Sequence, residues 1–500
     1  MGLLVTLVMK YLPLVLGFLI GKTIIKLVLR RWELQKIFKA FSGPKPHFLW
    51  GNTKELFGDY QGLVRMAELA HVYSGAYPAW TGPADAQLVI VTSGTTRAVL
   101  AGADPKDEFS NSLLGPWIGD GLLLSHGKKW ERTRRLLTPA FHSDNLKNYI
   151  KTFEECSKEL VKKWQHSTEP EEVFQHVSLL TLDIIMQCLF GFHSNCQSGS
   201  VLHPYIQGVY DVSELVAKRV VNPLYHYKFI YKLSGNGKRF QAACDAIHEH
   251  SERIIRERRS LIASEKPGTR NMDFLDVLLT AKDRDDVSLS DKEIRDEVNT
   301  FIFEGHESTA STITWFLYNM AKHPEYQNKC REEILEVIGK DKEITWNNIN
   351  KLSFTEMCIS ESMRLYPAVP LISRCLGQDT TLPDGRVVPK GVGVSVSLFA
   401  VHRDPEVWEN PHEYDPERFH PDKRVSSLIH MPFSTGPRKC IGMQFALTQV
   451  KVVACEILRN FHIDLDPPHE ATPESILFLR SKSGVYLKFI KLPVEGVPIL

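Results

Sequence analysis

One long helical pattern constrains the fold of this chain more than any other feature. It begins at a capping box formed by Ser290 and Glu293 and ends before Pro324. About 32 residues at 1.5 Å each give a helix of roughly 48 Å, long enough to cross a whole domain. Its apolar residues recur at helical spacing and predict deep burial: Ile294, Val298, Phe301, Ile302, Ile313, Phe316, Leu317 and Met320.

The middle of this helix breaks the apolar pattern with "EGHESTAS", residues 304–311. Burying two carboxylates, a histidine and three hydroxyls is costly unless they serve a chemical purpose. A water-filled kink at Gly305 is the alternative. Glu304 and Ser308 are i,i+4 neighbours that face the same way, which favours a functional site.

The rest of the chain is predicted to be mainly α-helical with a small β-sheet region. Strand-like segments occur at residues 86–93, 381–397 and 477–490, so the sheet is expected to assemble from both ends of the chain. No repeat and no second linker divides residues 52–500, which we interpret as one domain.

Composition excludes some classes of protein. The net charge is +1, with 24% charged and 43% hydrophobic residues, so the chain is globular and has no basic excess for binding nucleic acid. Its nine cysteines form no close-paired zinc pattern. Their scatter through apolar runs indicates reduced thiols in a reducing compartment.

The N-terminus differs from the remainder. Residues 2–21 are apolar except for Lys10 and match the length of about 20 residues that spans a bilayer. Lys22, Lys26, Arg30 and Arg31 follow, which keeps that side cytoplasmic. We therefore expect a transmembrane anchor over 1–31, in preference to an interfacial helix or a cleaved signal peptide. A proline-containing hinge over 32–51 and a catalytic domain over 52–500 follow.

The segment "PFSTGPRKCIG", residues 432–442, places one cysteine after a glycine–proline bend and two cations, just before a helical pattern. Gly436 and Pro437 predict a turn whose N–H groups point at the sulfur, and the helical pattern from Met443 puts its positive end near Cys440. Both effects are expected to lower the pKa of the thiol. A lone thiolate is a poor zinc site but suits haem iron, which brings its other ligands. A core cysteine before a helix describes Cys455 better.

This segment resembles the haem-binding signature F-x-x-G-x-R-x-C-x-G of the cytochromes P-450. The family's other landmarks occur in the same order, so the resemblance covers essentially the whole chain. It implies the cytochrome P-450 fold, haem b as cofactor, and Cys440 as the axial ligand of the iron. It also implies monooxygenase activity, in which one oxygen atom of O2 enters a C–H bond.

Two further groups of residues resemble the family's structural and haem-binding positions. Glu361 and Arg364 in "ESMR" match the E-x-x-R motif, on a helix expected to open with the capping box Ser353/Glu356, and Arg418 in "PERF" would join them in a structural triad. Arginine forks match carboxylates. The resemblance accordingly implies the following partners for the haem propionates: Trp130, Arg134, Arg374 and Arg438.

Glu307 and Ser308 resemble the acid–alcohol pair that relays protons during oxygen activation. The commonest pattern has threonine after the acid, and Ser308 keeps only its hydroxyl. "FEGHESTAS" also resembles family 4, the fatty-acid ω-hydroxylase branch, in which the glutamate at position 304 can become esterified to a haem methyl group. The alternative is that Glu304 stays protonated and packs beside the porphyrin.

The resemblance implies ω-hydroxylation of fatty acids or related lipids, which are lipophilic substrates. Because the chain has no Rossmann fingerprint, its electrons must come from NADPH through a separate protein. The implied donors are NADPH-cytochrome P-450 reductase and cytochrome b5, and the implied location is the endoplasmic reticulum membrane, with a single span and a cytoplasmic catalytic domain. A basic face is expected around Lys128, Lys129, Arg132 and Lys439.

Two other functions remain open at this point. One is a reductase-independent haem-thiolate isomerase or dehydratase, against which the Glu307–Ser308 pair argues. The other is a non-enzymatic haem sensor or carrier.

Overall fold

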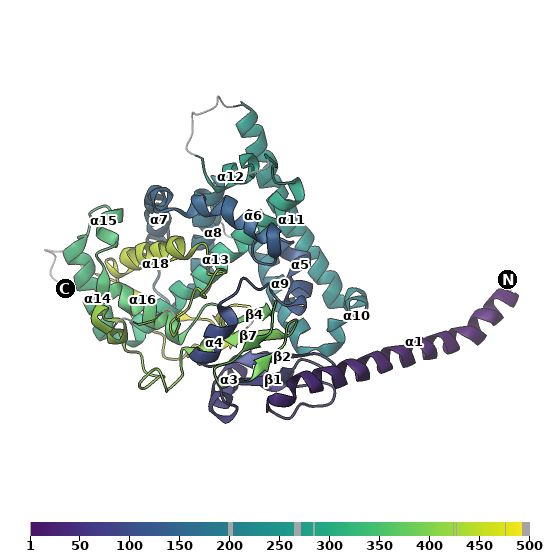
Figure 1. The fold of residues 1–500 in the computed structure, drawn as a ribbon. Coiled ribbons are helices and arrows are strands. Elements are labelled where there is room, and N and C mark those ends of the chain that lie inside the picture. Colours follow the sequence, from purple (N-terminus) through teal and green to yellow (C-terminus); the bar gives the residue numbers. More distant parts are fainter. Residues whose placement is uncertain are drawn as a thin grey trace.

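The computed structural model describes residues 2–198, 204–264, 272–283, 286–423, 425–426, 428–475 and 477–492. Helices dominate it (Figure 1), as predicted. The α-helices are α1 (Gly2–Ile37), α2 (Thr53–Leu56), α3 (Tyr60–Val72), α4 (Ser93–Leu100), α5 (Glu108–Ile118), α6 (Gly127–Leu137), α7 (Ser143–Trp164), α8 (Val173–Phe190), α9 (Pro204–Val221), α10 (Lys228–Leu233), α11 (Gly235–Ser264), α12 (Phe274–Thr280), α13 (Asp291–Lys322), α14 (Pro324–Val337), α15 (Trp346–Ile349), α16 (Ser353–Leu365), α17 (Leu398–Val401) and α18 (Met443–Leu458). Short 3-10 helices are η1 (Phe38–Ala40), η2 (Thr138–Phe141), η3 (Cys196–Ser198), η4 (Pro223–His226), η5 (Pro416–Phe419) and η6 (Pro421–Lys423).

The strands form small sheets that join distant parts of the chain. They are β1 (Ala76–Trp80), β2 (Ala86–Ile90), β3 (Glu171–Glu172), β4 (Leu371–Cys375), β5 (Thr380–Thr381), β6 (Val387–Val388), β7 (Gly393–Ser397), β8 (Phe461–Leu465), β9 (Pro473–Ser475), β10 (Leu479–Ser481) and β11 (Tyr486–Lys491). One sheet has the order β1-β2-β7-β4, in which β2 and β7 are parallel and the other pairs antiparallel. Another has the order β3-β11-β8. The predicted assembly from both ends of the chain is confirmed.

Helix α13 is the central element of the helical body. Ser290 caps it with the full capping box, because its hydroxyl accepts from the backbone N–H of Glu293 and the Glu293 carboxylate accepts from that of Ser290. The helix runs without a break to Lys322, before Pro324, as predicted. It packs against α8, α16 and α18. The alternative of a kink at Gly305 is therefore wrong: a Cβ there would lie 2.5 Å from Ile185 of α8, so this glycine lets the two helices approach closely.

Helix α16 does not begin as predicted. Ser353 and Glu356 form no capping box, since the side chain of Ser353 makes no cap hydrogen bond within the helix. Glu333 of α14 instead accepts from the backbone N–H groups of Phe354 and Thr355, at 2.7 and 2.8 Å, and from the Thr355 hydroxyl. Glu356 is paired with Lys451 of α18. A carboxylate 20 residues upstream therefore caps α16.

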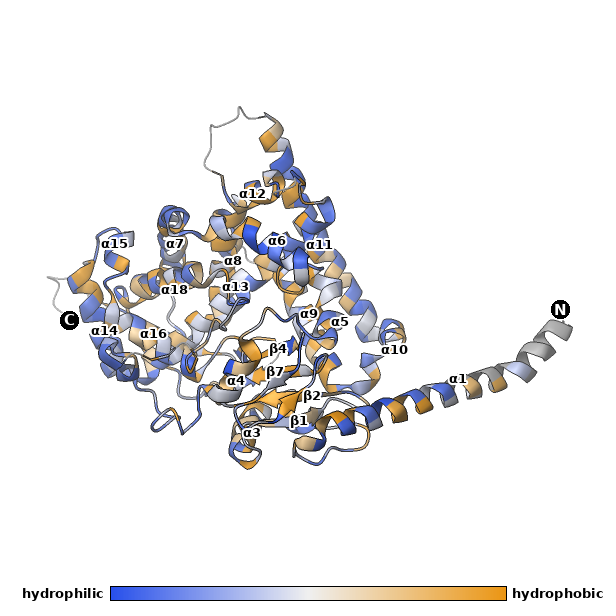
Figure 2. Ribbon diagram, viewed as in Figure 1, coloured by the Kyte–Doolittle hydropathy of each residue, from blue (hydrophilic) through white to orange (hydrophobic). Residues whose placement is uncertain are grey.

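Two helices bear on the question of a membrane span. Among the described residues, α8 is the one helix that is long and apolar enough to cross a membrane. It is mostly buried, however, and packs between α7 and α13. Helix α1 projects from the body (Figures 1 and 2), with Ile24, Ile25, Val28 and Leu29 exposed. Its base is fixed, because Leu34 packs with Phe38 and Phe41 against the β1-β2-β7-β4 sheet.

We expect Glu333→Ala to destabilise the protein by about 1–2 kcal/mol, because the first turn of α16 loses its cap. Urea unfolding should show a lower midpoint with an unchanged slope. Glu332→Ala, at the exposed neighbouring position, is the control. Equal midpoints for the two variants would contradict the tertiary cap.

Candidate functional site

A cavity of about 430 Å³ lies between α13 and the loop that carries Cys440. Glu304 and Ser308 of α13 line it, and Cys440 lines it from the loop. Much of its other lining is apolar, including side chains from α5, from the segment before β4 and from the segment before β10. The structure thus brings the polar centre of the long helix and the singled-out cysteine to one enclosed space.

The Cys440 loop has a fixed backbone. The N–H of Cys440 donates to the carbonyl of Phe433 at 2.9 Å, and the N–H of Lys439 donates to that of Gly436 at 3.1 Å. Gly436 has φ +74°, and a Cβ at this position would lie 2.2 Å from the carbonyl oxygen of Leu100, so only glycine fits. Helix α18 starts immediately after the loop, at Met443. The loop therefore holds the sulfur at the cavity wall.

The expected lowering of the Cys440 pKa is wrong for the protein by itself. The Cys440 side chain is exposed at the cavity, but desolvation by the surrounding protein raises the pKa of its thiol to about 11, and Glu304 adds to the rise. The backbone N–H of Gly442 and the charge of Arg134 act in the opposite direction, as the turn predicted, but burial outweighs them. A cation bound to the sulfur, such as a metal ion, would favour the thiolate at this position.

Three of the predicted propionate partners form a positive wall. Arg134, Arg374 and Arg438 line the cavity, and the Arg438 guanidinium lies 4.8 Å from the ring of buried Trp130. Burial lowers the pKa of Arg374 to about 10, and burial together with repulsion from Arg374 and Arg134 lowers that of Arg438 to about 10.

These arginines retain unsatisfied hydrogen-bonding capacity. The Nε atoms of Arg374 and Arg438 are buried and have no hydrogen-bond partner among the described residues. Within the same part of the chain, no carboxylate forms an ion pair with Arg134, Arg374 or Arg438. A group with two carboxylates fits this wall, because each guanidinium can bind a carboxylate through two N–H groups. The residues present therefore fit a haem with its propionates.

Lys106 is a further cation of this cavity that the sequence did not reveal. It lines the same space from the segment before α5. Burial and the charge of Arg374 lower its pKa to about 7, and the charge of Glu304 opposes both effects. No motif surrounds Lys106 in the sequence, so only the tertiary structure could have identified it.

Glu304 and Ser308 share the cavity face of α13, as their spacing predicted. Burial raises the pKa of Glu304 to about 7, against the opposing charge of Lys106. The Ser308 hydroxyl donates to the backbone carbonyl of Glu304 at 2.7 Å. Thr309 also lines the cavity, and its hydroxyl donates to the carbonyl of Gly305.

Glu307 lies apart from Ser308, although the two are adjacent in sequence. Its fully buried carboxylate is ion-paired with Arg480 of β10, and its Oε1 lies 3.3 Å from Nε2 of His306. Burial by itself would raise the pKa of Glu307, but Arg480 and His306 outweigh burial and bring it down to about 2. No motif marks Arg480 in the sequence, because its position follows from the packing of β10 beside the helix.

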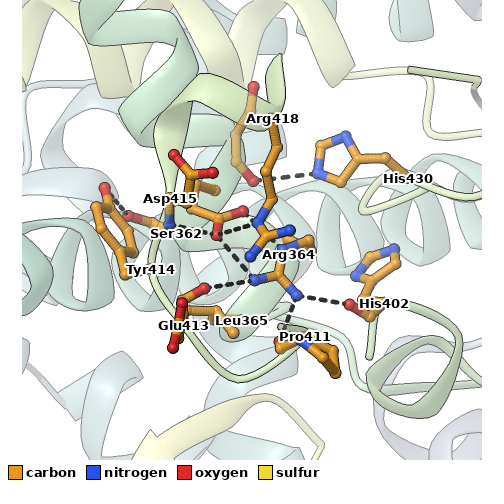
Figure 3. Close-up of polar contacts among 12 residues, drawn as sticks. Ser362, Arg364, Leu365, His402, Pro411, Glu413, Tyr414, Asp415, Arg418 and His430 are labelled. Atoms are coloured by element: carbon orange, nitrogen blue, oxygen red, sulfur yellow. Dashed lines mark hydrogen bonds and ion pairs between the residues drawn. The ribbon is translucent and has the colours of Figure 1, made fainter. Parts of the chain in front are cut away.

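Glu361, Arg364 and Arg418 lie together behind the site (Figure 3). Arg364 donates to both oxygens of Glu361, at 2.6 and 2.8 Å, and Nε of Arg418 lies 3.3 Å from Oε1 of Glu361. Arg364 also donates to the carbonyls of His402, Pro411 and Glu413. These contacts tie α16 to the irregular segment that precedes the Cys440 loop, and they do not reach the cavity.

The comparisons with known proteins agree with this arrangement. A model of the family described as Cytochrome P450 matches residues 41–489. The chain is 44% identical over 470 residues to "Ultra-long-chain fatty acid omega-hydroxylase" of Homo sapiens, covering 90% of this chain and 88% of that protein. It is 42% identical over 464 residues to "Leukotriene-B4 omega-hydroxylase 3" of Mus musculus, covering 89% and 88%. It is 41% identical over 465 residues to "Cytochrome P450 4F6" of Rattus norvegicus, covering 89% and 86%.

The buried histidine behind the ion-pair cluster makes stability pH-dependent. His402 is fully buried and its Nε2 accepts from the N–H of Met431 at 3.0 Å. Burial, with help from the nearby charges of His430 and Arg364, lowers its pKa well below the ordinary value. The unfolded chain takes up this proton near pH 6.5 and the folded chain does not, so the stability is full above pH 6.5 and falls below it.

We therefore expect His402→Gln, which keeps an acceptor for Met431 but does not titrate, to flatten the acid side of the stability curve. Between pH 6.5 and 5 the wild type should lose up to about 1.4 kcal/mol more per pH unit than the variant. Urea unfolding at several pH values measures this, with the exposed His420→Gln as control. Parallel curves for the wild type and His402→Gln would contradict the argument.

Proposed function

The chain belongs to the cytochrome P450 family and is a monooxygenase of that family, and we propose that it hydroxylates the terminal carbon of fatty acids or related lipids. The observation that carries this proposal is Glu304, a half-buried carboxylate on the helix face that lines an otherwise largely apolar cavity. The names of the relatives support the same substrate class.

Haem is the cofactor that the family implies, and the residues of the cavity wall would hold it. Cys440 would supply the thiolate ligand, and Arg134, Arg374 and Arg438 would bind the propionates, with Trp130 beneath Arg438. When bound, haem supplies oxygen activation and the oxidation of a C–H bond, with electrons that originate from NADPH. Ser308 would present its hydroxyl to the cavity as the group that passes protons into it.

The apolar walls would admit an aliphatic chain and exclude water. Leu113, Leu114 and residues 369–371 line the cavity. Trp117 does not line the cavity but belongs to the core, where the centroids of its ring and that of Phe303 lie 4.1 Å apart. The carbonyl of Leu479 accepts hydrogen bonds from Ser311 and Trp315. A narrow channel beside a rigidly held haem would favour attack at a chain terminus over the weaker internal C–H bonds.

Helix α1 would anchor the protein in the endoplasmic reticulum membrane as a single span, with the catalytic domain in the cytoplasm. Its projection from the body and its exposed apolar side chains support this placement (Figure 2). The exposed side chains of Leu224, Phe229, Ile230 and Leu233, from η4 and α10, support a second contact with the lipid surface.

NADPH-cytochrome P-450 reductase and cytochrome b5 are the proposed electron donors. The exposed Lys128 and Lys439 would contribute to an acidic partner's docking site. Two members of the expected basic face are already engaged: Lys129 is paired with Asp120 at 2.7 Å, and Arg132 is paired with Asp283 at 2.6 Å. We therefore expect their contribution to docking to be smaller than the sequence suggested.

We expect Glu304 to attach part of the haem covalently as an ester. Acid–organic extraction of the denatured wild-type holoprotein should leave haem on the polypeptide, whereas Glu304→Ala should release all of it. Glu297→Gln is the control on the same helix, because Glu297 is buried and accepts from the N–H of Leu122 instead of lining the cavity. Complete release of haem from the wild type would overturn the ester.

Product analysis with a panel of fatty acids, reductase and NADPH tests the proposed function directly. The expected products carry the hydroxyl on the terminal carbon, and their formation requires NADPH. Products formed from a peroxide substrate without NADPH would indicate an isomerase or dehydratase. Hydroxylation confined to internal carbons, or to no member of the panel, would contradict terminal oxidation of fatty acids.

A further inference from the structure

His306 holds a proton whose place follows from its contacts. The side chain is fully buried, and Nδ1 lies 2.9 Å from the carbonyl oxygen of Ile302. A carbonyl oxygen only accepts, so Nδ1 carries a hydrogen. Nε2 lies 3.3 Å from Oε1 of Glu307. Both atoms are buried and neither makes a hydrogen bond to a described residue, so the contact is close but is not aligned as a hydrogen bond. One proton between His306 and Glu307 would satisfy both atoms.

Side chains from α8, α9 and α11 surround this proton on the side of the helical body. The ring centroids of Tyr205 from α9 and His306 lie 5.9 Å apart. Those of His250 from α11 and Tyr205 lie 5.2 Å apart. Helix α8 contributes the hydroxyl of Thr181, which donates to the His306 carbonyl at 3.1 Å.

Arg480 completes the set of charged groups that face this pair. It binds the other oxygen of Glu307, and its guanidinium lies 4.9 Å from the ring of Tyr210, also from α9, and 4.9 Å from that of Phe174. Its side chain is 14% exposed, whereas those of His306 and Glu307 are 0% exposed. Solvent therefore reaches the pair from the Arg480 side.

We propose that His306 and Glu307 share one transferable proton, and that His306 is the positioning residue that lets Glu307 carry it to Ser308 as a neutral acid. The proposal rests on the relay role proposed for Ser308. In the step, the proton passes from Nε2 of His306 to Oε1 of Glu307. It then passes to Oγ of Ser308 as the hydrogen of that hydroxyl leaves into the cavity. Water replaces the proton from the Arg480 side, and no electrons move.

The charge balance explains why the histidine is needed. Ser308 lies about 100° around the helix from Glu307, so the carboxyl group must turn and release Arg480 to reach it. Moving a carboxylate away from its partners inside the protein would be costly, but a protonated carboxyl group carries no charge. His306 returns the proton to Glu307 for this movement. The imidazole itself remains neutral, and its Nδ1–H still donates to the carbonyl of Ile302.

His306→Asn tests the proposal in the full-length holoprotein. Asparagine keeps an N–H donor for the Ile302 carbonyl but has no atom in the position of Nε2. We expect peroxide formed per NADPH to rise at least about threefold, and the solvent deuterium isotope effect on product formation to increase. We also expect the wild-type rise of peroxide with pH, between about pH 6 and 9, to disappear in the variant, because the shared proton is gone.

Thr181→Val is the matched control, because it removes a hydrogen bond to the same residue without removing an acid or base. It should behave as the wild type. The infrared stretch of carbon monoxide bound to the reduced protein gives a readout without turnover: it should shift with pH in the wild type and Thr181→Val, and stay fixed in His306→Asn.

A wild-type isotope effect and pH profile in His306→Asn would overturn the proposal. If that variant binds no haem, His306→Gln decides by the same criteria, since it places a polar group near the Nε2 position but cannot hold the extra proton. The ratio of peroxide to NADPH and the infrared stretch do not depend on which substrate is oxidised. Failure of fatty-acid ω-hydroxylation therefore remains distinguishable from failure of this proposal.

Discussion

Burial of ionisable groups around one cavity is the physical constraint on which the rest of this structure depends. A thiol, a carboxyl group, a lysine and several arginines border the same enclosed space, and burial is the largest influence on the pKa values of Cys440, Glu304, Lys106, Arg374 and Arg438. Each of these groups is costly without a partner. A cation for the sulfur and two carboxylates for the arginines remove most of that cost together, which is why a haem suits this cavity so well.

The scaffold supports this cavity from two directions. Helix α13 crosses the body as one continuous element and presents its polar centre from one side. On the other side, the fully buried pair of Glu361 and Arg364 ties α16 to the segment that leads to the Cys440 loop. An ion pair of this kind is weak evidence of stability by itself, since desolvation offsets its attraction. Its geometric value is that one guanidinium fixes three separate carbonyl groups of an irregular segment.

Local patterns predicted from sequence were reliable where the controlling contacts are local. The cap of α13 at Ser290 and its end before Pro324 depend on residues within a few positions, and both are confirmed. The cap of α16 depends on Glu333, far outside any capping pattern, so the predicted box was wrong. Lys106 and Arg480 also take their places through tertiary packing alone. The pKa of Cys440 was predicted in the wrong direction because a sequence shows the N–H groups of a turn but not the extent of burial.

Glu304 and Glu307 show how neighbouring charges decide the chemistry of two glutamates on one helix. Both are glutamates on one helix, three residues apart, and both are enclosed by protein. Glu304 faces only the partly charged Lys106, so burial prevails and its pKa rises to about 7. Glu307 faces Arg480 and His306, which outweigh burial and lower its pKa to about 2. One carboxyl group is therefore poised between its two protonation states at the cavity wall, while the other is held as an ion behind it. Because Glu307 is ion-paired with Arg480 while Glu304 lines the cavity, the helix keeps these two states apart within a single turn.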